Sequence, residues 1–233
     1  MPTITYERRR GQLETYFDRT AAETWSRLTS DAPVGRIRTT VRAGRNRMRD
    51  VLLGCLPEDM RGLSLLDAGC GTGALAIEAA RRGARVTAID LSATLVSLAR
   101  DRSPPDLGAG SIEFLVGDML DPDLGAFDHV VAMDSLIHYA AADTVRVLAG
   151  LAARTRASIV FTFAPRTPAL AAMHAVGRLF PRGQRAPSIE PVALATLARL
   201  IADEPALRAW RTQRTERVVS GFYTSQALEL VAG

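Results

Sequence analysis

The chain has 233 residues, 47% of them apolar, which is enough to bury the core of one α/β domain with additions. No apolar stretch approaches the roughly 18 residues that a membrane span needs, and two cysteines are too few for a disulfide framework; both facts argue against a membrane-spanning protein and a disulfide-rich secreted domain. The formal net charge is only +4, yet residues 1–50 hold eleven arginines against six acidic residues, a surplus that suits an anionic partner.

Two helices are predicted before the first strand. Apolar and aromatic positions at helical spacing predict a helix over residues 6–30, which Pro33 and Gly35 end. A second helix is predicted over residues 37–56. We therefore expect residues 1–60 to form a helical arm or cap, and residues 61–233 to form the main domain.

From residue 63 the pattern alternates between short apolar runs and helical segments, which is typical of a parallel sheet with crossover helices. Strands are expected at residues 63–68, 85–90, 111–116, 127–133 and 158–164. The helices between them are expected at residues 74–82, 92–102 and 141–153. An excursion over residues 165–187 precedes a helix (189–202) and two strands (207–219 and 222–231) that form an antiparallel hairpin around Ser220-Gly221. The predicted fold class is α/β, with a mostly parallel sheet of seven strands.

A glycine-rich loop follows the first of these strands, in the run Leu65-Leu66-Asp67-Ala68-Gly69-Cys70-Gly71-Thr72-Gly73. Glycines allow a sharp turn and a close approach of a ligand, and the helix beyond offers free N–H groups. Two cofactor classes use such a loop. Read as G-x-G-x-x-A it fits a dinucleotide fingerprint; read as D-x-G-x-G-x-G it resembles the S-adenosylmethionine loop of class I methyltransferases. A carboxylate at Asp67 attracts the ammonium and sulfonium of S-adenosylmethionine and gains nothing from a pyrophosphate, so we favour the methyltransferase interpretation.

Aspartates end or follow each of the first four predicted strands, where ligands of open α/β sheets bind. Asp90 lies 23 residues after Asp67, close to the spacing at which an acid accepts hydrogen bonds from ribose hydroxyls. Gly117-Asp118-Met119 resembles the methyltransferase segment whose acid binds the adenine amino group and whose next residue packs on the ring. The expected cofactor-binding set is Asp67, Gly69, Cys70, Gly71, Asp90, Leu91, Asp118, Met119 and Asp134.

Segments outside this loop carry a more specific resemblance. Asp134-Ser135-Leu136-Ile137-His138-Tyr139 is similar to the D-x-L-I-H-Y run of magnesium-protoporphyrin O-methyltransferases. Further matching segments are Tyr16-Phe17, Trp25, Arg42-Ala43-Gly44-Arg45, Phe163-Ala164-Pro165 and Ser220-Gly221-Phe222-Tyr223-Thr224-Ser225. The resemblance implies a Rossmann-like class I methyltransferase fold, with S-adenosyl-L-methionine as cofactor. It also implies a magnesium porphyrin substrate, one propionate of which becomes a methyl ester in chlorophyll or bacteriochlorophyll synthesis.

The resemblance also implies roles for residues beyond the cofactor loop. His138 is expected to act as a base or as an orienting donor, with Tyr139 as a weaker catalytic candidate, and Tyr16 is expected to contact the cofactor. Some relatives carry a tyrosine where Thr29 stands, so a mechanism that needs two titrating partners is in doubt. Residues 165–187 are expected to cover the substrate. The candidate substrate residues are Arg36, Arg38, Arg166 and Arg182 for the propionates and Met173 and Phe180 for an apolar wall.

Two alternatives stay open at the level of the sequence. The first is a methyltransferase for another small acid or quinone-type metabolite, with the same cofactor residues. The second is a non-catalytic module that binds RNA or a partner protein through the basic N-terminal region, although arginines and aromatics are not interleaved as base stacking requires. We expect no nucleic-acid partner, and no metal site, because His129, His138 and His174 lack metal-ligand spacing.

The location and the partners are expectations of the same kind. No signal peptide is expected, because polar residues follow Arg8-Arg9-Arg10, and a cytoplasmic location is expected. Peripheral contact with a membrane stays open. The resemblance makes the porphyrin-binding subunit of magnesium chelatase a candidate partner.

Overall fold

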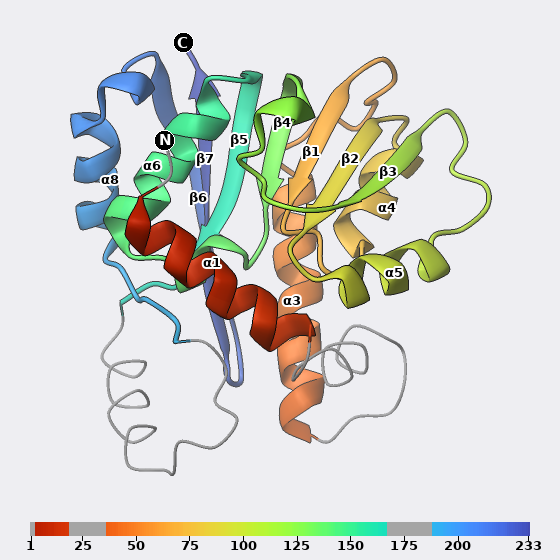
Figure 1. Ribbon diagram of the computed structural model, residues 1–233, viewed down its shortest axis with the longest axis horizontal. Coiled ribbons are helices and arrows are strands. Elements are labelled where there is room, and N and C mark those ends of the chain that lie inside the picture. The colour runs from red at the N-terminus through yellow and green to blue at the C-terminus, as the bar shows by residue number, and fades with distance from the viewer. Residues whose placement is uncertain (1–2, 19–35, 167–187) are drawn as a thin grey trace.

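The computed structural model describes residues 3–18, 36–166 and 188–233 (Figure 1). One sheet of seven strands runs through it in the order β3-β2-β1-β4-β5-β7-β6. The strands are Ser64–Ala68 (β1), Arg85–Asp90 (β2), Ser111–Val116 (β3), Phe127–Ala132 (β4), Thr155–Phe163 (β5), Trp210–Ser220 (β6) and Tyr223–Ala232 (β7). Strands β1 to β5 pair in parallel, whereas β7 pairs antiparallel with both β5 and β6. The prediction of a mostly parallel seven-stranded sheet with an antiparallel C-terminal hairpin is confirmed.

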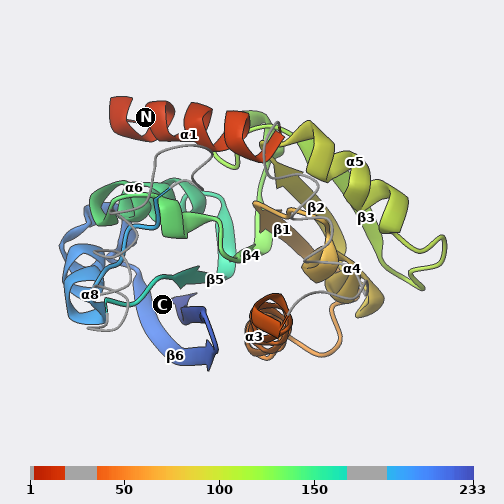
Figure 2. The same ribbon diagram turned by 90° about the horizontal axis from the view of Figure 1, so that it is seen from below.

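Helices cover both faces of this sheet. The α-helices are Ile4–Tyr16 (α1), Arg36–Leu53 (α3), Ala74–Arg81 (α4), Ala93–Arg102 (α5), Ala141–Ala152 (α6) and Leu194–Asp203 (α8). Adjacent strand residues point to opposite faces, so Leu65 packs with the cluster that includes α3, α4 and α5, while Leu66 packs with the cluster that includes α1, α6 and α8. Both leucines are fully buried. Figure 2 shows α1 and α3 on opposite sides of the sheet.

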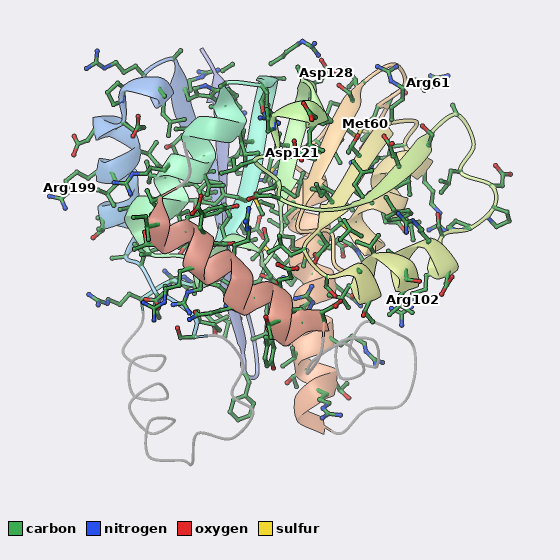
Figure 3. The ribbon with its side chains drawn as sticks, viewed as in Figure 1. Met60, Arg61, Arg102, Asp121, Asp128 and Arg199 are labelled. Carbon is green, nitrogen blue, oxygen red and sulfur yellow. The ribbon has the colours of Figure 1, made fainter. Side chains whose placement is uncertain are left out.

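The amino ends of the parallel strands β1 to β5 lie at one end of the molecule, and the glycine loop after β1 lies at the other end. Figure 3 labels Arg61 and Asp128 there, next to the starts of β1 and β4. Asp128 accepts hydrogen bonds from the backbone N and the hydroxyl of Ser64 at 2.8 Å each and ties these two strands together. The opposite, carboxyl ends of the parallel strands are therefore where a ligand site is expected.

Local signals in the sequence set several element ends. Ser92 caps α5 through a hydrogen bond from the N–H of Leu95, in keeping with the preference for serine at this position. Gly83 follows α4 with a φ of +96°, a conformation that favours glycine, and so ends that helix.

Several predicted bounds were wrong, for identifiable reasons. The helix predicted at 189–202 begins at Leu194, because Pro191 disfavours a helical residue before it and residues 188–193 run without helical structure instead. The strand predicted from residue 207 begins at Trp210, after a 3₁₀ turn over Pro205–Leu207. Strand β5 begins at Thr155, three residues earlier than predicted. The helix predicted over 6–30 is described only as α1, since residues 19–35 lie outside the described residues, as do residues 167–187 of the predicted excursion.

Helix α3 is part of the main core rather than only a cover. Met48 and Leu52 are fully buried in the same cluster as the sheet residues Leu65 and Val131. This packing places one face of α3 against the sheet and leaves the adjoining face beside the carboxyl ends of the strands.

Candidate active site

A cavity lies beyond the carboxyl ends of the parallel strands. Its wall contains one aspartate from or just after each of the first four strands: Asp67, Asp90, Asp118 and Asp134. Helix α1 and helix α3 also contribute to the wall, so elements from both faces of the sheet enclose it (Figure 2). The structure thus brings together the four carboxylates that the sequence placed at strand ends.

The glycine loop owes its shape to close contacts within the protein. Gly69 has a φ of +85°, and a Cβ there would lie 2.4 Å from Cβ of Ser135, in the loop after β4. The backbone N–H of Gly71 donates to Oδ2 of Asp90 at 2.8 Å. The loop is therefore pressed against the end of β4 and tied to the end of β2, which makes it a fixed wall of the cavity.

Asp67 is the most buried of the four carboxylates. It is 1% exposed, and its Oδ2 atom has no hydrogen-bond partner among the described residues. Burial, together with the nearby charge of Asp90, raises the pKa of Asp67 to about 7. A buried carboxyl in this state has a strong preference for a cationic group at the cavity surface.

Asp90 and Asp118 are already held by protein donors. Burial raises the pKa of Asp90, whose Oδ1 accepts from the N–H of Ser92 at 3.0 Å. Asp118 accepts from Oη of Tyr6 at 2.6 Å and from Nη1 of Arg10 at 2.7 Å, both on α1. These bonds fix the carboxylates at the cavity wall, and they tie α1 to the loop after β3.

Asp134 is surrounded by donors from three elements. Its side chain is 5% exposed and forms an ion pair with Arg45 of α3, with Nη1 at 2.6 Å from Oδ2. Tyr223 donates to it at 3.1 Å from β7. Asp134 thus lies at a junction of the fold as well as at the cavity.

His138 and Tyr139 both line the cavity but face different neighbours. His138 is buried beside Phe17, with ring centroids 6.0 Å apart, and its Nδ1 is 3.3 Å from the carbonyl oxygen of Ser188. Burial lowers its pKa, so the ring is neutral at pH 7. The ring of Tyr139 stacks on Tyr6 at 5.0 Å, beside Asp118, and burial raises its pKa. Tyr139 therefore lies on the Asp118 side of the cavity.

Three buried side-chain atoms have no hydrogen-bond partner among the described residues: Oδ2 of Asp67, Nε of Arg49 and Oγ of Ser135. All three residues line this one cavity. An acid, a guanidinium N–H and a hydroxyl together match a ligand that carries both a cation and an anion, such as an α-amino acid group. The methionyl part of S-adenosylmethionine carries such an α-amino acid group, so these unsatisfied polar groups of the cavity are complementary to it.

The remaining predicted residues are distributed as follows. Gly69, Cys70, Gly71, Leu91 and Met119 line the cavity. Tyr16 does not line it; the neighbouring Phe17 does, and the two rings meet edge to face at 5.2 Å. Arg38 and Arg166 are exposed and do not line it. Thr29, Met173, Phe180, Arg182 and the side chain of Arg36 lie outside the described residues.

Sequence reasoning missed residues on the two helices. Tyr6 and Leu13 line the cavity from α1, as does Phe17 directly after it, and Arg42, Arg45, Asn46 and Arg49 line it from α3. The signal was available, because spacings of seven and four residues in the first set, and of three and four residues from Arg42 to Arg45, Asn46 and Arg49 in the second, place each set on one helical face. The sequence does not show which element each of these two helical faces packs against.

Comparison with known proteins gives matches over nearly the whole chain. Residues 132–232 match the family model described as "Magnesium-protoporphyrin IX methyltransferase C-terminus", and residues 65–157 match a general methyltransferase domain. The magnesium-protoporphyrin O-methyltransferase of Rhodobacter capsulatus is 50% identical over 225 residues, which is 96% of this chain and 97% of that protein. The magnesium protoporphyrin IX methyltransferase of Arabidopsis thaliana is 31% identical, over 93% of this chain and 69% of that protein.

A solved structure agrees with these matches. The crystal structure of magnesium protoporphyrin IX methyltransferase from Synechocystis PCC 6803 with bound SAH superimposes with a TM-score of 0.83 at 27% identity. The superposition covers 96% of this chain and 99% of that chain.

Proposed function

The chain belongs to the magnesium-protoporphyrin O-methyltransferase family, and we propose that it uses the cavity at the strand ends to transfer a methyl group from S-adenosyl-L-methionine to a propionate of magnesium protoporphyrin IX. The observation that carries this is the 50% identity to a curated family member over 96% of the chain. The product is a monomethyl ester in chlorophyll or bacteriochlorophyll synthesis.

The cofactor, when bound, supplies a methyl group on a positively charged sulfur. Asp67 receives its ammonium group, since Asp67 has a buried oxygen without a partner among the described residues. Arg49 and Ser135 receive its carboxylate through their unpartnered buried atoms. Asp90 takes the ribose hydroxyls, and Asp118 takes the adenine amino group.

The cofactor base is expected to lie between residues from two strands. Leu91 and Met119 line the cavity next to Asp90 and Asp118 and offer the apolar surface that an adenine ring packs against. Tyr6 and Tyr139 line the same region with stacked rings. Tyr6 lines the cavity and Tyr16 does not, so we propose Tyr6 as the aromatic residue of α1 that contacts the cofactor; the predicted contact of Tyr16 stays a prediction.

The methyl transfer itself asks the protein mainly for alignment. A bond forms between a propionate oxygen and the methyl carbon while the carbon–sulfur bond breaks, and its electron pair stays on sulfur. A propionic acid in water has a pKa near that of glutamic acid, about 4.3, so the substrate is ionised at neutral pH and needs no strong base. Holding the oxygen in line with the methyl group can supply roughly 7–11 kcal/mol of the barrier reduction.

His138 is the residue that we assign to the substrate carboxyl group. Its Nδ1 faces a carbonyl oxygen of Ser188, which can only accept, so Nδ1 carries the proton and Nε2 is the acceptor in the neutral ring. A neutral acceptor can take the proton of any substrate that enters as the acid. The role of Thr29 stays a prediction, since it lies outside the described residues.

The proposal is tested by incubating the purified protein with labelled S-adenosylmethionine and magnesium protoporphyrin IX. We expect one labelled methyl ester per porphyrin, sensitive to mild alkaline hydrolysis. The dimethyl ester of the same porphyrin is the matched control, because it has no carboxylate to accept the methyl group. Label in the dimethyl ester, or none in the diacid, contradicts the proposal. A second substrate class, another small acid or a quinone, has no observation in its favour.

Two finer parts of the proposal concern where the substrate is collected. No helix among residues 3–18, 36–166 and 188–233 has the length and apolarity to cross a bilayer. We propose a cytoplasmic enzyme with peripheral membrane contact, supported by the basic N-terminal region, and transfer of substrate from the porphyrin-binding subunit of magnesium chelatase. Co-sedimentation with anionic vesicles tests the membrane contact. Binding of the protein to the porphyrin-loaded chelatase subunit tests the transfer of substrate.

A further inference from the structure

A polar cluster beside the cavity joins four parts of the chain that are distant in sequence. It consists of Asp134 after β4, Arg45 on α3, Thr162 on β5, and Tyr223 and Ser225 on β7; we call it the Asp134 cluster. Asp134 has a φ of +54° and is the only non-glycine residue with positive φ among the described residues. Such backbone conformations cost free energy and persist where surrounding contacts enforce them.

The oxygens of Asp134 are fully engaged by the protein. Oδ2 accepts from Arg45 Nη1 at 2.6 Å and from Tyr223 Oη at 3.2 Å. Oδ1 shares the same Tyr223 hydroxyl hydrogen at 3.1 Å and also accepts from Thr162 and Ser225 at 3.2 and 3.3 Å, so four donor groups surround the carboxylate. A carboxylate has about four acceptor positions, so little capacity remains for a ligand. Asp134, expected from the sequence to bind cofactor, instead holds protein groups in place.

The backbone of α3 is fixed at the same point. A Cβ on Gly44, next to Arg45, would lie 2.5 Å from the ring of Tyr223. A Cβ on Gly221, in the turn between β6 and β7, would lie 2.3 Å from Oγ1 of Thr40. Two glycines thus let α3 press directly on the hairpin. Both the backbone and the guanidinium of Arg45 are therefore set by contacts, while Arg45 also lines the cavity.

Arg45 lies one helical turn from the proposed cofactor site. Arg49, assigned above to the cofactor carboxylate, follows Arg45 by four residues, which places the two on the same face and about 6 Å apart along the helix axis. Met48 and Leu52, near Arg49, pack in the cluster that contains Cys70 of the glycine loop. Arg45 is displaced from that loop towards the hairpin. Helix α3 therefore presents a row of cations along the cavity wall, Arg42, Arg45 and Arg49, of which Arg45 is the one held by Asp134.

Resting on the proposed function, we propose that Arg45 binds the propionate carboxylate of the substrate beside the methyl donor, and that Asp134 is a positioning residue that holds Arg45 for this purpose. Guanidinium is the cation best suited to a carboxylate. An arginine that is already held loses less side-chain entropy on binding, which favours a defined carboxylate position. A buried ion pair does not by itself stabilise a fold. The place of the Arg45–Asp134 pair at the cavity wall instead indicates that it orients the Arg45 guanidinium towards the cavity.

The test measures binding of two porphyrins in the presence of saturating S-adenosylhomocysteine. Magnesium protoporphyrin IX has two carboxylates, and its dimethyl ester has none. For Arg45→Gln we expect the affinity for the diacid to fall roughly 10- to 100-fold, the loss typical of a charged hydrogen bond, with little change for the dimethyl ester. Arg47→Gln is the matched control, because Arg47 lies exposed on the same helix and does not line the cavity. It should leave both affinities unchanged.

The positioning role of Asp134 is tested with the same two ligands. Asp134→Asn should raise KM for the diacid more than it lowers kcat, and it should add little loss in the Arg45→Gln background, since both act on one carboxylate contact. Arg45→Lys should restore part of the diacid affinity. Unchanged S-adenosylhomocysteine affinity is expected throughout. Equal weakening of diacid and dimethyl ester, or a loss confined to S-adenosylhomocysteine, overturns the inference. Failure of the wild-type protein to bind either porphyrin overturns the proposed function instead.

Discussion

At the scale of single residues, Asp67 shows how burial sets a chemical preference. The sequence placed an acid before the glycine loop; the structure adds that one of its oxygens is buried without a partner among the described residues. Its pKa of about 7 follows from burial and from the charge of Asp90. Near neutral pH the free protein therefore holds this carboxyl partly protonated. A cation bound next to it favours the ionised form.

We expect cofactor binding at pH 7 to release a proton from Asp67. The apparent Kd for S-adenosylmethionine should weaken, by up to roughly tenfold per pH unit, as the pH falls below 7. Calorimetry in buffers of different ionisation enthalpy measures the released proton. Asp67→Asn is the control variant and should bind weakly with no such pH dependence. The same dependence in that variant would contradict the assignment.

The same residue has a consequence for stability. A folded-state pKa raised above the unfolded value of about 3.9 gives stability that is fully present below the unfolded pKa and is lost as the pH rises through about 7. Asp67→Asn carries no such charge. We therefore expect the melting temperature of this variant minus that of the wild type, both without cofactor, to be more positive at pH 8 than at pH 5. A constant difference between the two proteins across this range would show that Asp67 is not the titrating group.

His138 is the second residue whose state depends on burial. The lowered pKa keeps its ring neutral at pH 7, so kcat should fall only when the pH drops below the usual histidine value of about 6.5. His138→Gln should reduce kcat roughly 10- to 100-fold, as expected for one lost orienting hydrogen bond, and should remove this acidic limb. Cofactor affinity measured by calorimetry should not change. Equal losses in kcat and in cofactor affinity would indicate a structural residue.

At the scale of elements, helices α1 and α3 close the cavity by different means. Helix α1 is attached through side chains, including Tyr6 and Arg10 on Asp118 and Arg9 on Glu190 at 3.0 Å. Helix α3 also has side-chain attachments, but at Gly44 its backbone lies directly against the ring of Tyr223. A ligand or water molecule can replace the partner of a polar side chain. It cannot replace the close packing of a glycine backbone against a ring. The two helices should therefore respond differently to substitution.

Glycine substitutions separate these two modes. Gly44→Ala should destabilise the protein by about 1–3 kcal/mol, because the added Cβ would lie 2.5 Å from a Tyr223 ring carbon. Gly11→Ala in α1 is the matched control: no atom lies within 4 Å of its Cβ position, so it should stabilise by up to about 1 kcal/mol through helix propensity. Urea unfolding measures both. Similar free energies of unfolding for the two variants would mean that α3 does not press on the hairpin.

At the scale of the whole molecule, the cavity joins the two faces of the sheet. Helices α1 and α3 belong to different core clusters and lie on opposite sides, yet both line it (Figure 2). A ligand there contacts elements from both layers. Its binding energy should therefore add to the stability of the entire fold rather than to one half.

We expect S-adenosylhomocysteine at 100 times its Kd to raise the free energy of unfolding by about 2.7 kcal/mol in a single transition. Asp90→Asn should reduce this increment by weakening the binding of the ribose. Asp128→Asn is the matched control, because Asp128 lies at the opposite end of β4 (Figure 3). It should keep the full increment even if it lowers stability itself. Differential scanning calorimetry measures all three, and no increment in the wild type would contradict the cofactor site.

The sequence by itself determined the order of strands and helices, because alternating apolar periodicity and local signals such as Ser92 and Gly83 act over a few residues. It also determined that Asp67, Asp90, Asp118 and Asp134 meet, since the carboxyl ends of parallel strands share one edge. Its errors were local too: Pro191 delayed the start of α8.

Only the tertiary structure decided which helix faces turn towards the cavity. The stripe from Arg42 to Arg49 and the contact of Tyr6 with Asp118 depend on pairs of residues separated by many tens of positions, which no short-range pattern encodes. The same holds for Asp134, whose neighbours come from α3, β5 and β7. Residue type fixed the chemistry that each side chain offers, and long-range packing fixed which partner it meets.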